Sequence, residues 1–134
     1  MACKKTGIMT AEELRKMHKK LHESSFEPKG IYRGYADRSL YINLSTNEVK
    51  VKQISEDMKK KFTGGRGYGM KYLWDAVNPD TRWDSPENEI IIAQGPIGGI
   101  TQYPGSGKSY VVTISPLTDL PVDSNVGGHF GPLF

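Results

Sequence analysis

Apolar and polar side chains alternate in two neighbouring segments, residues 40–44 and 49–52. Alternation with a period of two is typical of β-strands that have one apolar face and one wet face. The four residues between the segments, Ser-Thr-Asn-Glu, are turn formers, and Asn47 is the residue expected in a left-handed conformation. The pattern therefore predicts a β-hairpin.

Two helical patterns follow the hairpin, separated by a glycine cluster at residues 64–67. Ser55 is the expected N-cap of the first, short helix, which has two acidic residues in its first turn and three lysines, 59–61, in its last. These charges complement the helix dipole, so the lysine run is interpreted as solvated surface. Apolar residues of the second helix recur at helical spacing: Met70, Leu73, Trp74 and Val77.

The C-terminal half predicts two more strands around a long loop. Residues 90–93 form a continuous apolar run, as expected of a strand covered on both faces. Residues 95–107 are a Gly/Pro loop, residues 110–114 a buried strand and residues 116–123 a turn. The whole pattern predicts an α+β fold, with a strongly bent mixed β-sheet flanked by two short helices.

The N-terminal segment is expected to be an extension, residues 1–30, preceding a domain over residues 31–134. Residues 1–9 are predicted to be disordered. Thr10 and Glu13 have the spacing of a capping box that opens a helix. Leu14, Met17 and Leu21 form its narrow apolar stripe.

His18 and His22 lie one turn apart on this predicted helix. That spacing suits a metal pair, but no carboxylate–histidine motif accompanies it, which favours a solvated or docking face. Residues 24–34, which contain proline and glycine, are expected to be a linker.

Charge is distributed unevenly along the 134 residues. The net charge is +3, and residues 1–29 carry seven Lys/Arg against four acids, so the rest of the chain is neutral. A neutral body disfavours nucleic-acid binding, which needs a concentrated basic face. The single cysteine, Cys3, excludes an internal disulfide framework or cysteine cluster and fits a reducing cytoplasm. No segment has the length of a membrane span or the pattern of a signal peptide.

The sequence Gly-Ser-Gly-Lys-Ser at 105–109 is similar to the end of a phosphate-binding P-loop. A P-loop needs a glycine at position 102, which is Gln102, and a helix after the lysine. Here a β-branched strand sequence follows, so an NTPase is disfavoured. What remains is a glycine loop with one ammonium group, Lys108, a combination suited to an anionic ligand.

Two other glycine motifs, at 65–69 and 125–128, are loops or turns when each is taken singly. His129 is the one histidine in the body, and the carboxylates are scattered, so no acid–base or nucleophilic set is indicated. The body thus offers binding surfaces rather than catalytic side chains.

Read in order, these motifs resemble the start of the aldehyde ferredoxin oxidoreductases, a family of tungsten–pterin enzymes. The matching stretches are residues 40–49, 62–67, 84–88, 94–99, 104–108, 112–118 and 123–131. The resemblance covers about three quarters of the chain and leaves residues 1–30 outside.

The resemblance implies a tungsten ion, or molybdenum, held between two pterin dithiolenes against an N-terminal domain. Lys108 matches an arginine that contacts pterin, and Gly127 matches a glycine that touches it. Asn125 matches an asparagine whose backbone carbonyl binds a Mg²⁺ bridging the pterin phosphates. Arg66 in the Gly-Gly-Arg-Gly motif is a further candidate contact. Lysine keeps the charge of the usual arginine but lacks its planar, multi-donor fork.

The resemblance also implies an oxidoreductase that converts aldehydes to carboxylic acids with ferredoxin as electron acceptor, in the cytoplasm. The family's 4Fe-4S cysteines and catalytic side chains lie in later domains, so the expected partner is the remainder of the enzyme or a large catalytic subunit. The basic extension is then a natural docking element. Two alternatives stay open: a non-catalytic pterin carrier or assembly subunit, and a degenerate structural domain.

Overall fold

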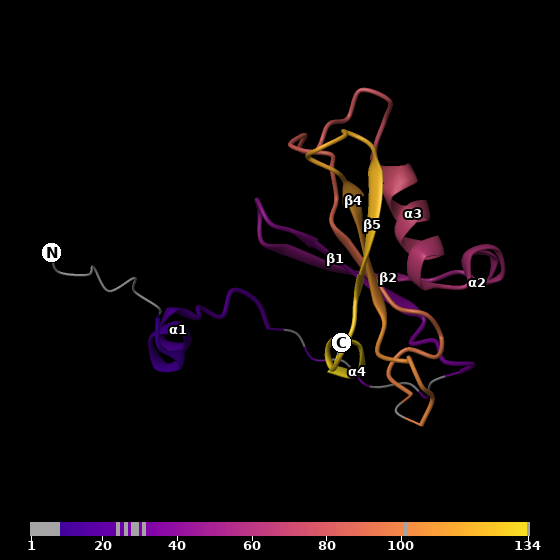
Figure 1. Cartoon of the computed structure of the whole chain (residues 1–134), viewed down its shortest axis with the longest axis horizontal. Helices are drawn as coiled ribbons and strands as arrows, with labels where there is room; N and C mark the ends of the chain where they lie inside the picture. The colour runs from indigo at the N-terminus through magenta and orange to yellow at the C-terminus, as the bar shows by residue number, and fades with distance from the viewer. Residues whose placement is uncertain are drawn as a thin grey trace, which may run out of the picture.

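A computed structural model describes residues 9–23, 25, 27, 30, 32–100 and 102–133. The expected disordered lead up to residue 8, with Cys3, and about half of the expected linker lie outside the described residues. The α+β class is confirmed, but in place of the one bent mixed sheet that was expected the strands form two antiparallel sheets, one of two strands and one of three. Figure 1 shows both sheets, with α1 apart from the body.

The helices and strands have the following bounds in chain order: α1 Ala11–Met17, β1 Arg38–Asn43, β2 Glu48–Gln53, α2 Glu56–Phe62, α3 Gly65–Ala76, β3 Ile91–Ala93, β4 Ser109–Ile114, β5 Pro121–Val126 and α4 Phe130–Leu133. The order of strands in the larger sheet is β3-β4-β5.

The predicted hairpin is confirmed as β1 and β2, with Leu40 opposite Val51 and Asn47 at φ 57° in the turn. Its apolar face, however, is turned to solvent: Leu40, Ile42 and Val51 are all more than half exposed. The polar face lies toward the body, where the Tyr72 hydroxyl donates to Ser39 Oγ at 3.2 Å. A two-stranded sheet with an open apolar face is marginal by itself.

The core lies between α3 and the larger sheet. Leu73, Val112 and Ile114 are its buried apolar side chains, and Tyr110 packs against them. Gly69 lets the helix approach β4, because a Cβ there would lie 2.4 Å from Val112 Cγ2. Figure 1 shows α3 alongside β4 and β5.

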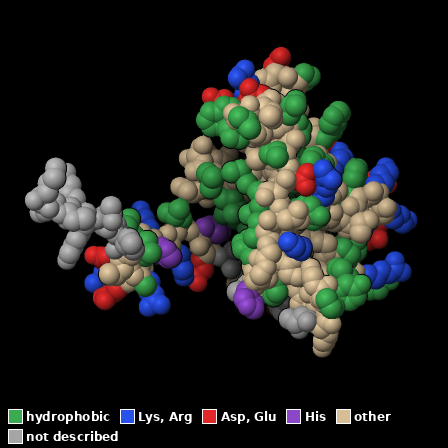
Figure 2. All heavy atoms as spheres, viewed as in Figure 1, with side chains coloured by type: hydrophobic (Ala, Val, Ile, Leu, Met, Phe, Trp, Pro, Cys, Tyr) green, Lys and Arg blue, Asp and Glu red, His purple; other side chains and the backbone are tan. Residues whose placement is uncertain are grey.

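Several expectations from the apolar pattern are wrong. Trp74 is 79% exposed because α3 turns it away from the sheet, although its spacing matches the apolar stripe. The strand predicted at residues 90–93 is not covered on both faces, since Ile90 and Ile92 are exposed. Figure 2 shows apolar side chains spread over the visible face of the body.

The strand β5 was not predicted, because its sequence Pro-Val-Asp-Ser-Asn-Val is rich in turn formers. It exists through pairing with β4, where Thr113 faces Val122 and Tyr110 faces Asn125. As an edge strand it tolerates a proline at its first position. Tertiary pairing here overrides local propensity.

The N-cap of α2 is confirmed, since the Met58 amide donates to Ser55 Oγ at 3.1 Å. The lysine run is only partly solvated. Lys59 Nζ lies 2.5 Å from Asp37 and 2.6 Å from Glu56, and these two hydrogen bonds raise its pKa above the ordinary lysine value. Lys59 therefore fastens the segment before β1 to α2.

The capping box of Thr10 and Glu13 is present, but α1 ends at Met17. Leu21 and His22 lie beyond it, so the expected stripe and histidine pair do not share one helix. No residue of α1 is buried. Within the described part of the chain, no helix has the length and apolar character needed to cross a membrane.

Candidate functional site

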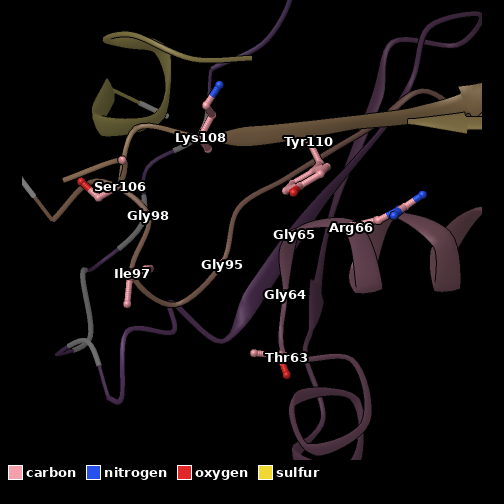
Figure 3. A pocket seen from close by; sticks show the side chains of 11 residues that line it. Thr63, Gly64, Gly65, Arg66, Gly95, Ile97, Gly98, Ser106, Lys108 and Tyr110 are labelled. Atoms are coloured by element: carbon pink, nitrogen blue, oxygen red, sulfur yellow. The ribbon is translucent and has the colours of Figure 1, made fainter. Parts of the chain in front are cut away.

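Three segments distant in sequence converge on one pocket of about 360 Å³ (Figure 3). They are the α2–α3 junction, the loop after β3 and the loop before β4. The lining residues are Thr63, Gly64, Gly65, Arg66, Gly95, Ile97, Gly98, Gly105, Ser106, Lys108 and Tyr110. The volume falls in the range of small-molecule and cofactor sites.

The α2–α3 junction is pressed against the loop after β3. The Gly65 amide donates to the Gln94 carbonyl at 2.8 Å. A Cβ on Gly64 would lie 2.9 Å from that same carbonyl oxygen, and Gly64 has a φ of 154°. Only glycine permits so close a backbone approach at this conformation.

Thr63 precedes this junction in an unusual backbone conformation. Its φ is 60° and its ψ is −51°, which costs free energy for a β-branched residue. The Tyr35 hydroxyl donates to the Thr63 carbonyl at 2.7 Å and helps to hold it. Strained residues of this kind concentrate at binding sites and catalytic sites.

The loop after β3 and the loop before β4 are both held by the C-terminal segment. Gln94 Nε2 donates to the Gly131 carbonyl at 2.6 Å. A Cβ on Gly107 would lie 2.5 Å from the Gly128 carbonyl oxygen, and one on Gly131 would lie 2.5 Å from the Gly107 carbonyl oxygen. The two glycine segments therefore interlock backbone to backbone, which fixes the position of Lys108 beside them.

Gly95 differs from the other glycines of the pocket wall. An added Cβ there would meet nothing within 4 Å, and its φ lies outside the positive range. Neither the fold's packing nor its backbone conformation therefore requires glycine at this position. A side chain at Gly95 would take up open space at the pocket wall without contacting the fold.

Of the four predicted site residues, the structure places Arg66 and Lys108 in the pocket wall, whereas Asn125 and Gly127 do not line the pocket. Lys108 and Arg66 both line the pocket, although Figure 3 shows their charged ends pointing away from each other. Gly127 lies beside Lys108, because a Cβ on it would be 3.5 Å from Lys108 Nζ. Asn125 is paired with Tyr110 across the β4–β5 ladder. The roles of these residues toward a cofactor stay predictions.

Sequence reasoning missed Tyr110, Asp123 and Gly95 as residues of this region. Tyr110 was assigned only to a buried strand, yet Figure 3 shows its ring directed toward Gly65 at the pocket wall. Asp123 Oδ1 lies 2.8 Å from Arg66 Nη2. A recognised β5 would have indicated Asp123, since alternation along a strand puts residues 123 and 125 on one face.

The two cations of the pocket differ in their surroundings. Arg66 is paired with Asp123, whereas no described carboxylate lies within ion-pair distance of Lys108. Both side chains are exposed to solvent. Within the described residues, no three His, Cys, Asp or Glu side chains lie close enough together to hold a metal ion. Of the two cations that line the pocket, Lys108 is therefore the one without a described carboxylate partner, and an anion would meet its positive charge there.

Comparison with protein families gives a match over residues 39–134 to the model described as aldehyde ferredoxin oxidoreductase, N-terminal domain. The tungsten-containing aldehyde ferredoxin oxidoreductase of Pyrococcus furiosus is 43% identical over 94 residues, which are 70% of this chain and 15% of that protein. A protein from the same organism named aliphatic sulfonate oxidoreductase, WOR-like subunit, is 34% identical over 102 residues, 72% of this chain and 16% of the relative.

Among solved structures, the active-site complex BamBC of benzoyl coenzyme A reductase aligns with a TM-score of 0.70 and 31% identity. The alignment covers 74% of this chain and 15% of that one. The chain thus spans about one sixth of the length of the relatives it matches. The expected resemblance is confirmed over the body and does not extend to the N-terminal segment.

Proposed function

Because the chain belongs to the family defined by the aldehyde ferredoxin oxidoreductase N-terminal domain, we propose that its glycine-lined pocket is part of the binding site for a tungsten–bispterin cofactor. The observation that carries the proposal is that Arg66 and Lys108 both line one glycine-rich pocket, with Gly127 beside Lys108. The family match alone would not locate the site. The pocket supports the proposed location.

The residues present fit such a group. Pterin phosphates are anionic, and Lys108 provides a positive charge with no carboxylate partner among the described residues. Gly95 leaves open space where a side chain would obstruct a ligand. Lys108 and Arg66 would hold the cofactor, Gly127 would allow close approach, and the Asn125 backbone carbonyl would bind Mg²⁺, a hard cation that prefers oxygen ligands. When bound, the cofactor supplies the redox chemistry; this chain supplies its binding and orientation.

The whole protein is proposed to oxidise aldehydes to carboxylic acids and to pass electrons to ferredoxin. The 4Fe-4S cluster and catalytic side chains would then belong to the remainder of the protein or to a large partner subunit. The open apolar face of the β1–β2 hairpin supports assembly with further polypeptide, since exposed contiguous apolar surface marks interaction sites. Residues 1–30 are proposed to be an extension that assists this docking.

The proposal is tested by metal analysis of the protein purified from its native host together with its partners. Near-stoichiometric tungsten or molybdenum, with pterin, is the expected result. A partner that carries cluster cysteines favours the enzyme, whereas a lone, cofactor-loaded chain favours a carrier or assembly subunit. An assembled complex with neither metal nor pterin contradicts both and leaves a degenerate structural domain.

Replacing Gly95 with alanine is expected to separate folding from cofactor retention. The added methyl group meets no atom of the fold, so stability should be unchanged or slightly higher, by up to about 1 kcal/mol, because alanine restricts the unfolded chain. Pterin retained per chain should fall roughly fivefold or more, since the fit of one methyl group is worth on the order of 1 kcal/mol. Pterin fluorescence after acid release and urea unfolding measure the two effects.

The matched control is Gly30→Ala, at another position where a Cβ meets nothing within 4 Å but which does not line the pocket. This variant should keep both stability and pterin content. Equal pterin retention in the Gly95 and Gly30 variants would show that the pocket wall does not touch the cofactor.

A further inference from the structure

Asp123 holds the Arg66 guanidinium at one end of the pocket. Asp123 Oδ1 lies 2.8 Å from Arg66 Nη2. The carboxylate side chain is 18% exposed and the arginine 64%, so the acid is the fixed member and the arginine the exposed one. Arg66 sits in the first turn of α3, and the ion pair therefore ties the start of this helix to β5.

The strand register gives this pair a defined place relative to the other site residues. Asp123 faces Val112 and Asn125 faces Tyr110 across the β4–β5 ladder. The same register, continued by two residues, sets Gly127 opposite Lys108, as their close approach shows. At one end of this edge of the site, Asp123 neutralises Arg66. At the other end, Lys108 has no carboxylate partner among the described residues.

A second arginine–aspartate pair is attached to this sheet but lies away from the pocket. Arg82 Nη2 lies 2.7 Å from Asp119 Oδ2, at the turn that joins β4 to β5. Neither residue lines the pocket. Both aspartates pair with an exposed arginine, so the two pairs form a natural comparison.

We propose that Asp123 is a positioning residue that holds Arg66 in place and cancels much of its charge, so that the anionic end of the ligand binds at Lys108. This rests on the proposed cofactor site. Two like cations at the two ends would attract a phosphate without preference, whereas a carboxylate at contact distance offsets much of the attraction between Arg66 and an anion. The ion pair therefore makes the pocket electrostatically asymmetric.

The test uses the full chain, with inorganic pyrophosphate as the probe at low ionic strength. Asp123→Asn is expected to raise pyrophosphate affinity about fivefold, because Arg66 becomes available to the anion. Asp119→Asn, the matched control, should leave affinity unchanged. Asparagine tolerates the positive φ of 52° at residue 119, so the control does not distort the turn.

A double-mutant cycle distinguishes positioning from plain charge repulsion. If Asp123 acts through Arg66, the gain from Asp123→Asn should shrink by at least half in an Arg66→Gln background. An equal gain in both backgrounds, an unchanged affinity in Asp123→Asn, or an equal gain in Asp119→Asn would each overturn the proposal.

A second readout needs no ligand. The Arg66 Nε–Hε resonance in ¹⁵N NMR should be distinct in the native chain and move toward the averaged arginine position in Asp123→Asn. An unmoved resonance would contradict positioning whatever the binding result. Loss of pyrophosphate binding in every variant overturns this proposal. Absence of metal and pterin from the native assembly instead overturns the proposed function. The two failures are therefore distinguishable.

Discussion

Replacing Lys108 with glutamine is expected to weaken pyrophosphate binding about tenfold. The substitution removes the ammonium group that has no described carboxylate partner, and a hydrogen bond to a charged group is worth about 1.5 kcal/mol at the low end of its range. Binding is measured by titration calorimetry on the full chain. The affinity of the native chain should fall with added salt, and the variant's should fall less steeply.

Two further variants test whether the loss of binding is specific to the charge at Lys108. Lys108→Arg keeps the charge and adds the planar, multi-donor fork that lysine lacks, so binding should be retained. Lys60→Gln removes an exposed lysine of α2 that does not line the pocket, and it should have no effect. If Lys60→Gln weakened binding as much as Lys108→Gln, the anion would be responding to net charge rather than to a site.

Replacing Leu73 with alanine is expected to lower the free energy of unfolding by about 2–5 kcal/mol. The Leu73 side chain is 1% exposed and packs with Val112 and Ile114 between α3 and the sheet. Truncation removes apolar burial and leaves a cavity in a small core. Urea unfolding at equilibrium measures the change, with the slope checked for unaltered two-state behaviour.

The neighbouring Trp74→Ala serves as the control, because it removes a larger apolar side chain that is 79% exposed in the same helix. Its effect should stay within about 0.5 kcal/mol. Equal losses in the two variants would mean that α3 docks by a face different from the one described.

The local elements were predictable because their signals lie within a few residues. Ser55 and Thr10 cap helices as their sequence contexts require, and the hairpin of β1 and β2 forms around Asn47. The glycine loop before Lys108 was likewise predictable from its composition and the strand that follows it, while its role toward an anion stays a prediction. Each of these features depends on the backbone and its nearest neighbours.

The orientation of the elements was not predictable from the same patterns. Periodicity assigns Leu40, Val51 and Trp74 to apolar faces but does not state what those faces meet. In this chain they meet solvent, and the hairpin turns its polar face to the body. No described residue buries these three side chains, and only the spatial arrangement of the elements shows that they are exposed.

By itself the sequence determined the helix caps, the hairpin, the glycine-bordered loops and the family. Only the tertiary structure decided that β5 exists, that Asp123 holds Arg66, and that Gly95 faces open space beside the pocket. The reason is physical: caps and turns are local hydrogen-bonding problems, whereas β5 and the pocket arise from pairings between residues far apart in the chain, whose stability no short segment encodes.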